Sequence, residues 1–398
     1  MVLRPARELS EGPVSLATIL REWGRIGCIG FGGPPAHIAL LRRLCVTQRR
    51  WLSEGEFEDG IATVNLLPGP ASTQLAILCA WRLRGAAGAV VGGISFVVPG
   101  LVLILGLAVL FLGGHPPRWV AGASAGAGAA VPAVALQAAS GLARASRRRD
   151  GAATPARARW AVYLAAGAAG AATVGPWLVV ILAGAGVIEV IARGGAGRPG
   201  PARSGPAHGW LAVAAPGAAA GGLAGLAWVA LKVGLFSYGG GFVIIPLMQH
   251  DAVATYHWMT GPQFLSAVAL GQITPGPVVQ TVAAVGYAAA GIGGGLLAAL
   301  IAFAPSFLFV IAGGPHFDRL RRDARVQSFL TGAGAAAIGA IAGSAIPLAM
   351  ALGHLWQAGV LVLAGLWLIV ARRGIVSALV GAGAVGVVAA LAGAALAH

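Results

Sequence analysis

Acidic residues are scarce in this chain of 398 residues: Asp and Glu together number 12, whereas Lys and Arg number 27. Charged residues of both signs make up only 10% of the sequence, against about 25% in soluble domains. Hydrophobic residues make up 58%. No soluble fold could bury so much apolar sequence, so the composition excludes a soluble globular protein. It predicts an all-α protein that crosses a membrane several times.

Groups that bind metals or carry out catalysis are also missing. The three cysteines, Cys28, Cys45 and Cys79, have the spacing of neither a disulfide framework nor a metal site. Nothing resembles a phosphate loop, a metal-ligand cluster or a nucleophile beside a base. The sequence therefore predicts no metal, no cofactor and no enzymatic activity. A membrane enzyme that acts on an anionic lipid is the alternative from a different class, and the same absences argue against it.

The basic excess gives a net charge of +15, but it is not organised as a nucleic-acid surface. Short clusters of arginine separate the apolar stretches, which is typical of cytoplasmic loops under the positive-inside rule. No basic domain outside the membrane is long enough to bind nucleic acid. The arginines therefore predict topology and contacts with membrane lipid. Residues 1–13 are polar and charged, so they are predicted to be a cytoplasmic segment and not a cleavable signal.

One motif appears twice. Residues 66–70, Leu-Leu-Pro-Gly-Pro, return as Ile-Thr-Pro-Gly-Pro at 273–277, so that Pro68 and Pro275 are 207 positions apart. The flanks keep this offset without a gap, and the matched pairs are Gly27 and Gly234, Gly32-Gly33 and Gly239-Gly240, Ile38 and Ile245, Trp51 and Trp258, and Phe57 and Phe264. Polar positions match in kind, because Arg25 corresponds to Lys232 and Asn65 to Gln272. The chain therefore contains an internal repeat.

The repeat divides the chain into predicted parts. These are a first repeat over 14–192, a Gly/Pro/Arg-rich cytoplasmic linker over 193–209, a linking transmembrane helix over 210–228 and a second repeat over 229–398. In the first repeat, a helix over 14–29 breaks at 30–35 and a short piece over 36–44 follows. Residues 57–81 form a second broken unit around Pro-Gly-Pro. Each arm has about ten residues, too few for the roughly 20 of a span. Arginine on both flanks favours a re-entrant hairpin over a spanning unit, although the second interpretation stays open.

The remaining apolar stretches are predicted to be full crossings, at 85–112, 119–143, 160–174, 177–192, 293–313, 327–352, 357–370 and 375–396. The crossing over 357–370 is expected to return to the cytoplasmic face at Arg372-Arg373. Loops 249–263 and 287–295 contain no Lys or Arg, whereas their counterparts in the first half are basic. The two repeats are therefore predicted to be inverted. Inverted repeats with paired broken helices are typical of secondary transporters, whose site lies near the midplane.

The breaks also suggest what binds there. Unwound backbone in a membrane is tolerated only in a protein-lined or watered cavity. Helices that restart at Ala71 and Val278 present free N–H groups and partial positive charge, which favour anions, and the glycine runs expose further amides. The predicted substrate-binding residues at the breaks are Gly32, Gly33, Asn65, Pro68, Gly69, Pro70, Ser72, Thr73, Gln74, Gly239, Gly240, Gln272, Thr274, Pro275, Gly276, Pro277, Gln280 and Thr281. The alternative is that each break is a kink that only packs helices.

Ionisable residues favour an anion as well. Glu22 and Glu189 are the only acids inside apolar stretches, and a cation site would normally need carboxylates at the repeat centres. Arg25 and Lys232 lie one or two turns before the glycine breaks. They either supply compensating charge to the substrate or extend toward the lipid headgroups. His37, just after the first break, and Glu22 are candidates for proton coupling; the alternative for His37 is a hydrogen-bonded structural role.

These motifs resemble the chromate ion transporter family in its long, two-repeat form. The resemblance rests on Gly30-Phe31-Gly32-Gly33-Pro34 with Ala36-His37-Ile38, Trp51 with Phe57, Leu67-Pro68-Gly69-Pro70 with Thr73-Gln74, and in the second half Gly239-Gly240-Gly241, Trp258, Phe264, Gly271-Gln272 and Thr274-Pro275-Gly276-Pro277. It implies a multi-pass protein of the bacterial plasma (inner) membrane that exports chromate from the cytoplasm and confers chromate resistance. Sulfate would be the competing anion, and sulfate uptake is the neighbouring alternative. The sequence departs from the family pattern at Ser237-Tyr238 and at residues 81–85, which bears on selectivity. A homodimer is expected only from the frequency of membrane dimers.

Overall fold

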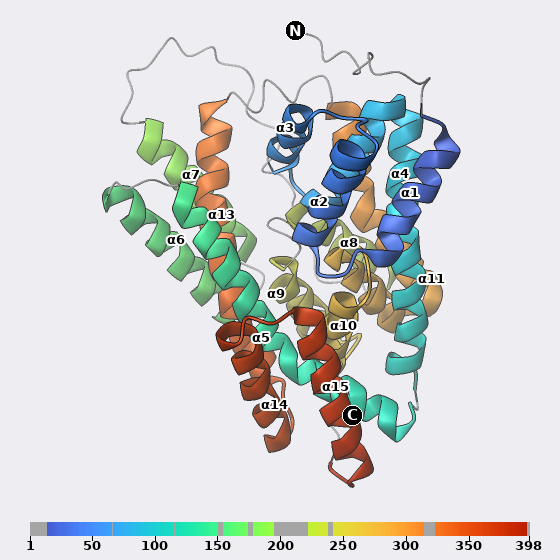
Figure 1. The fold of residues 1–398 in the computed structure, drawn as a ribbon. Helices are drawn as coiled ribbons and strands as arrows, with labels where there is room; N and C mark the ends of the chain where they lie inside the picture. The colour runs from blue at the N-terminus through green and yellow to red at the C-terminus, as the bar shows by residue number, and fades with distance from the viewer. Residues whose placement is uncertain are drawn as a thin grey trace.

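The fold is known from a computed structural model that describes residues 14–65, 67–114, 116–149, 154–173, 178–194, 222–237, 242–313 and 323–395. Within these ranges the chain forms helices and no strands, which confirms the all-α prediction (Figure 1). Within the described part of the chain, four helical stretches are long and apolar enough to cross a membrane: 71–112, 118–147, 278–313 and 324–350. The chain is therefore a polytopic helical membrane protein.

In the first half, the described residues form seven α-helices and a π-helical turn. They are α1 (Leu16–Ile29), α2 (Pro34–Arg42), η1 (Arg43–Gln48), α3 (Glu54–Val64), α4 (Ala71–Leu112), α5 (Arg118–Arg149), α6 (Thr154–Thr173) and α7 (Leu178–Gly194). Local capping explains two of the starts. The Ser15 hydroxyl accepts from Thr18 N–H at the start of α1, and Ser53 and Glu56 form a capping box at the start of α3.

In the second half many of these bounds recur at the offset of 207 residues. The elements are α8 (Leu223–Phe236), α9 (Ile244–Gln249), η4 (His250–Thr255), α10 (Gly261–Ile273), η5 (Val278–Gln280), α11 (Thr281–Gly313), α13 (Ala324–Met350), α14 (Leu355–Gly365), η7 (Leu366–Val370) and α15 (Ile375–Leu391). Helix α8 matches α1 at both ends, and η4 matches η1. A capping box of Thr260 and Gln263 starts α10, as Ser53 and Glu56 start α3.

The structure corrects one predicted boundary. Residues 223–228, expected to end a linking helix, instead begin α8, because Gly222 has φ +79 and stops any continuous helix into Leu223. The rest of that expected helix, residues 210–221, lies outside the described residues. So do residues 1–13 and the predicted linker from 195 onward.

The Pro-Gly-Pro unit of the first half doubles back on itself, as predicted. Arg82 donates a hydrogen bond to Glu56 O, so the end of the returning arm meets the start of α3. The helical path of α4 is then interrupted at Arg84 and Gly85, where Gly85 has φ +59. A β-carbon added at Gly88 would lie 2.3 Å from Ala80 O, so the two parts of α4 run side by side. Helix α11 has the same interruption at Ala290 and Gly291.

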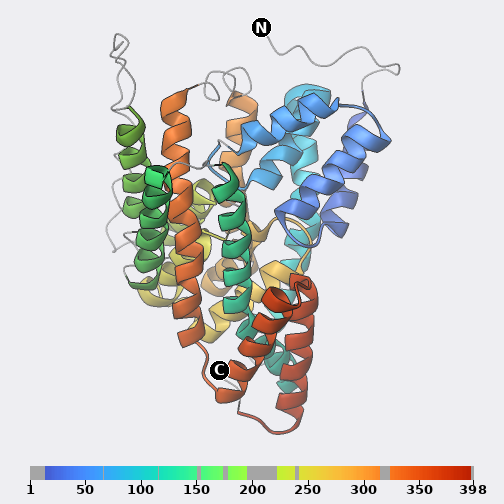
Figure 2. The ribbon, with the colours of Figure 1, turned by 60° about the vertical axis from the view of Figure 1, so that its left-hand side comes forward.

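The hairpin of α14 and α15 differs from its expected course. Both views place it at the end of the molecule opposite α1, α2 and α3 (Figures 1 and 2). The turn between its two helices, residues 371–374, points toward the middle of the molecule. The expectation that residues 357–370 return to the face of the first-half arginine loops is therefore wrong. The physical reason is length, because residues 355–370 are a short apolar helix, below the roughly 20 residues of a span.

The two halves are interleaved through small residues. Helix α13 of the second half packs against α6 and α7 of the first, and α15 packs against α5. The approach is close: a β-carbon added at Gly339 would lie 1.8 Å from Leu164 O, and one at Gly126 would lie 2.2 Å from Ala382 O. Such contacts are typical of helices that associate in lipid. The fold thus consists of two groups, α1–α4 with α8–α11 and α5–α7 with α13–α15, and each group draws on both halves.

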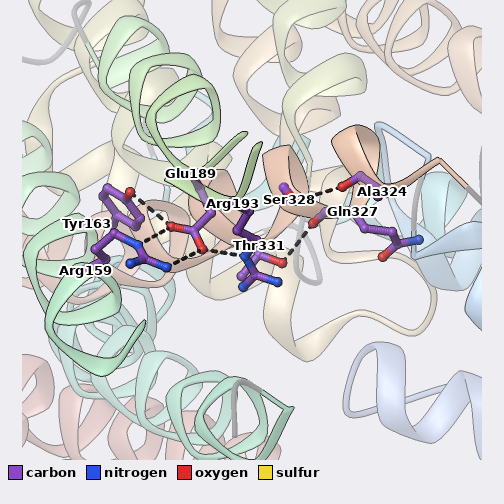
Figure 3. A network of polar contacts seen from close by, with 8 residues as sticks. All are labelled: Arg159, Tyr163, Glu189, Arg193, Ala324, Gln327, Ser328 and Thr331. Carbon is purple, nitrogen blue, oxygen red and sulfur yellow. Dashed lines mark hydrogen bonds and ion pairs between the residues drawn. The ribbon is translucent and has the colours of Figure 1, made fainter. Parts of the chain in front are cut away.

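A buried carboxylate joins α6 to α7 in the second of these groups (Figure 3). Glu189 is 3% exposed and accepts two hydrogen bonds from Arg159, at 2.9 and 3.3 Å, and one from Arg193 at 2.6 Å. The Tyr163 hydroxyl donates to the same carboxylate at 3.1 Å. Since two guanidinium groups surround it, Glu189 is an internal counter-ion that fixes the helix pair.

Candidate substrate-binding site

The broken helices of the two halves meet inside the first group. Gly276 N–H, in the second Pro-Gly-Pro, donates to Gly30 O, in the first glycine break, at 3.0 Å. The Gln280 side chain donates to Val97 O on α4 at 2.8 Å. Gly69, in the first Pro-Gly-Pro, comes so near α8 that a β-carbon there would lie 3.1 Å from Gly234 O. Breaks far apart in sequence therefore converge on one place.

The backbone at these breaks needs glycine. Gly32, Gly33, Gly69 and Gly276 have φ of +98, +72, +116 and +99, a region that side chains rarely occupy. Helix α4 restarts at Ala71 after Pro70, as predicted. The second restart also falls on the predicted Val278, but its first turn is a 3₁₀ helix, η5, before α11 begins at Thr281. Gly239 and Gly240, also predicted at the site, lie outside the described residues.

Several buried polar groups at the breaks have no protein partner. Among the described residues, those near the breaks are Thr73 Oγ1, Gln74 Oε1, Ser237 Oγ, Gln272 Nε2 and Ser306 Oγ. Leaving such groups unpaired in an apolar interior costs about 1–3 kcal/mol each, so their presence near the breaks favours a polar ligand there. Sequence reasoning singled out Thr73, Gln74 and Gln272. It missed Ser306, which lies on an apolar helix far from either motif, and treated Ser237 only as a departure from the family.

Other predicted residues use their polar groups in hydrogen bonds within the protein. The Thr274 hydroxyl donates to Leu270 O at 2.9 Å and the Thr281 hydroxyl to Val278 O at 2.8 Å. Gln74 Nε2 donates to Pro68 O at 2.6 Å. Asn65 caps the end of α3, and Pro275 and Pro277 are buried around Gly276. These residues therefore shape the breaks.

His37 connects two breaks. It is fully buried, its Nε2 lies 2.8 Å from Gly30 O and its Nδ1 lies 3.2 Å from the Ser72 hydroxyl. Because a carbonyl can only accept, Nε2 carries the proton and Nδ1 of the neutral ring accepts from Ser72. The ring also packs edge-on against Phe96, with centroids 5.0 Å apart. This geometry is the one expected for the structural alternative, because the ring holds the Gly30 carbonyl, which also accepts from Gly276 N–H.

The two predicted compensating cations, Arg25 and Lys232, lie in different surroundings. Arg25 is exposed on α1, as expected for a side chain that extends toward headgroups. Lys232, the only lysine of the chain, is partly buried, with Nζ 2.5 Å from Asp251 Oδ2 and 5.6 Å from the Trp228 ring centroid. Glu22 is likewise paired, with Arg49 at 2.8 Å and Arg21 at 3.4 Å.

The structure corrects the predicted position of Asp251. The sequence predicts it in the loop over 249–263, but it is buried on η4, with 8% of its surface exposed. The internal offset offered a signal, because residue 251 corresponds to the buried Leu44 of η1. A carboxylate at an apolar position calls for a partner nearby, and Lys232 provides it.

We expect the Lys232→Gln variant to be less stable than the wild type, whatever its effect on substrate binding. The change leaves the Asp251 carboxylate buried without a partner, which costs about 3–5 kcal/mol. The double variant Lys232→Gln, Asp251→Asn removes both charges and should recover most of that loss. Thermal unfolding of the detergent-solubilised variants measures this coupling. Equal melting temperatures for the single and double variants would contradict the pairing.

Helices from both halves, interrupted at glycine and proline and joined through buried polar groups, define a class: membrane proteins built like secondary transporters. The family model described as chromate transporter matches residues 17–189 and 224–391, two segments whose first residues are 207 positions apart. The chain belongs to the chromate transporter family.

Its relatives agree with the family. The chain is 33% identical over 343 residues to the chromate transport protein of Cupriavidus metallidurans, covering 84% of this chain and 83% of that one. It is 30% identical over 352 residues to the probable chromate transport protein of Synechococcus elongatus, covering 84% of each. An uncharacterized transporter of Methanocaldococcus jannaschii is 27% identical over 342 residues. No solved structure matches the chain.

Proposed function

We propose that the chain is a secondary transporter that exports chromate from the cytoplasm across the bacterial plasma membrane and so confers chromate resistance. The observation that carries the proposal is the group of buried, unpaired polar atoms at the converging breaks. Hydroxyl and amide groups beside helix N-termini suit a tetrahedral oxyanion. The relatives named as chromate transport proteins make chromate the first substrate to test.

Charge supports an anion as cargo. Among the described residues, the buried carboxylates Glu22, Glu189 and Asp251 are each paired with Arg or Lys, so none is free to hold a cation at the breaks. Outward movement of an anion from a cell that is negative inside is favourable by about 2.3 kcal/mol per charge per 100 mV. The membrane potential can therefore drive export without a proton relay.

The packing bears on how access alternates between the two sides. Inverted repeats, as predicted from the sequence, suggest a cycle in which the two halves rock against each other. The interleaving favours a different division, because α13 is held between α6 and α7 by close glycine contacts. In the proposed cycle, the group of α1–α4 and α8–α11 moves against the group of α5–α7 and α13–α15. If the halves are inverted repeats, exchanging their conformations converts an inward-facing state into an outward-facing one.

The test is chromate flux in everted membrane vesicles, where export from the cell becomes uptake. We expect saturable uptake of radiolabelled chromate that rises when the vesicle lumen is made positive and falls with excess sulfate. Vesicles without the protein are the background. No chromate uptake by well-expressed protein would contradict the proposal. Sulfate accumulation by intact cells, without chromate resistance, would favour the alternative of a sulfate uptake system.

A further inference from the structure

The two Pro-Gly-Pro breaks are not equivalent, although the sequence motif is the same. At the second break the backbone is closed: Gly276 N–H is bonded to Gly30 O, and Gln280 reaches across to Val97 O. At the first break, no backbone carbonyl of the described residues accepts a hydrogen bond from Gly69 N–H. Thr73 Oγ1 and Gln74 Oε1 are also without partners there. Two polar side-chain atoms beside the restarting helix therefore lack a partner at the first break, whereas at the second break the unpaired atom is Gln272 Nε2, ahead of the Pro-Gly-Pro.

The side chains that follow the two breaks also differ, because those after the first break are more polar. After Pro-Gly-Pro the offset between the halves shortens from 207 to 206, as the paired interruptions at Gly85 and Gly291 and the helix prolines Pro99 and Pro305 show. With this register Gln74 corresponds to Gln280. The counterparts of Ser72 and Thr73 are then Val278 and Val279. The restarting turn thus carries two hydroxyls in the first half and two valines in the second.

A third hydroxyl reaches the first break from the opposite half. Ser306 lies on α11, is fully buried and has no partner for its Oγ. This oxygen lies 3.3 Å from the position that a β-carbon would take at Gly69, so it is directed at the break. Gln74 Nε2 lies 2.7 Å from the same position. The counterpart of Ser306 at the second break is Gly100, which packs so tightly that a β-carbon would lie 2.1 Å from Pro275 O.

We infer that the transporter has one oxyanion site, at the first break, and that Ser306 binds the anion there together with Thr73. This rests on the proposed function and adds to it a location and a residue from the second half. Both hydroxyls donate to anion oxygens, and the free N–H groups at the first turn of α4 add partial positive charge. Because Ser306 is on α11 and Thr73 on α4, the bound anion connects the two halves, which a site confined to one motif would not do.

The experiment measures binding and transport separately. Binding is followed by the rise in melting temperature of the detergent-solubilised protein with added chromate or sulfate, and transport by chromate uptake into everted vesicles. The variants Thr73→Val and Ser306→Gly convert each residue to its counterpart at the second break. We expect each to raise the half-saturating chromate concentration tenfold or more, the factor for one lost hydrogen bond to a charged group. Ser306→Ala gives a second test that avoids a new glycine in a helix.

A matched control and the contrary outcomes follow from the same structure. Ser344 is also a fully buried serine, but its hydroxyl donates within α13 to Ile341 O, so Ser344→Ala should bind chromate as the wild type does. Wild-type affinity in both Thr73→Val and Ser306→Ala would overturn the site. A larger loss on removal of the Thr281 hydroxyl would place it at the second break instead and also overturn it. If the wild type itself binds neither oxyanion, the proposed function fails and the site with it.

Discussion

Replacing Gly69 with alanine is expected to abolish chromate uptake in everted vesicles. The residue has φ +116, where a side chain costs about 1–3 kcal/mol of backbone strain. The new β-carbon would also lie 2.7 Å from Gln74 Nε2 and 3.1 Å from Gly234 O. The break must therefore open or the neighbouring helix α8 must move, and either change removes the geometry of the inferred site. Uptake per amount of protein in the membrane is the measurement.

The variant Gly85→Ala separates strain from crowding. Gly85 also has positive φ, +59, but no atom lies within 4 Å of its β-carbon position at the turn within α4. We expect this variant to keep most of its chromate uptake, at the cost of some stability. If both variants lose uptake equally, backbone strain alone explains the effect. Wild-type uptake by Gly69→Ala would show that the break has no part in transport.

The second large effect concerns stability. Gly339→Ala should destabilise the protein strongly, because its β-carbon would lie 1.8 Å from Leu164 O where α13 crosses α6. Overpacking of this kind costs about 1–3 kcal/mol and occasionally more. On exposed Gly359 of α14, where no atom lies within 4 Å, the same substitution should leave stability unchanged or raise it by up to about 1 kcal/mol through helix propensity.

Thermal unfolding of both variants in one detergent checks this contrast. The expected result is a lower melting temperature for Gly339→Ala and an equal or higher one for Gly359→Ala. A shift in the same direction for both would mean that glycine in these helices acts through local propensity and not through the packing of α13 on α6.

The repeated motif made much of the architecture around the breaks predictable. Glycine and proline determine where helices stop, and the capping residues Ser53 and Thr260 determine where α3 and α10 start. These are local effects, so an ungapped offset transfers them from one half to the other. The restart at Ala71 and the return at Gly85 follow from the same local chemistry.

Other features could not be read from the sequence because they depend on which faces meet. In lipid, a helix face that contacts another helix is no more apolar than one that contacts lipid, so the place of α13 between α6 and α7 leaves no hydrophobic pattern. The pairing of Lys232 with Asp251 depends on a π-helical turn that the sequence presents as a loop. Ser306 was missed because one residue lost after Pro-Gly-Pro shifts the register, so that the constant offset hides its relation to Gly100.

The position of α13 also constrains how the protein is made. Synthesis proceeds from the N-terminus, so α6 and α7 leave the ribosome long before α13, with all of α8–α11 in between. During that interval the glycine-lined faces of α6 and α7 lack their final neighbour. Native packing of the first half is therefore completed only after residues 324–350 have entered the membrane. A chain terminated before Ala324 would therefore leave α6 and α7 incompletely packed as well as lacking the later helices.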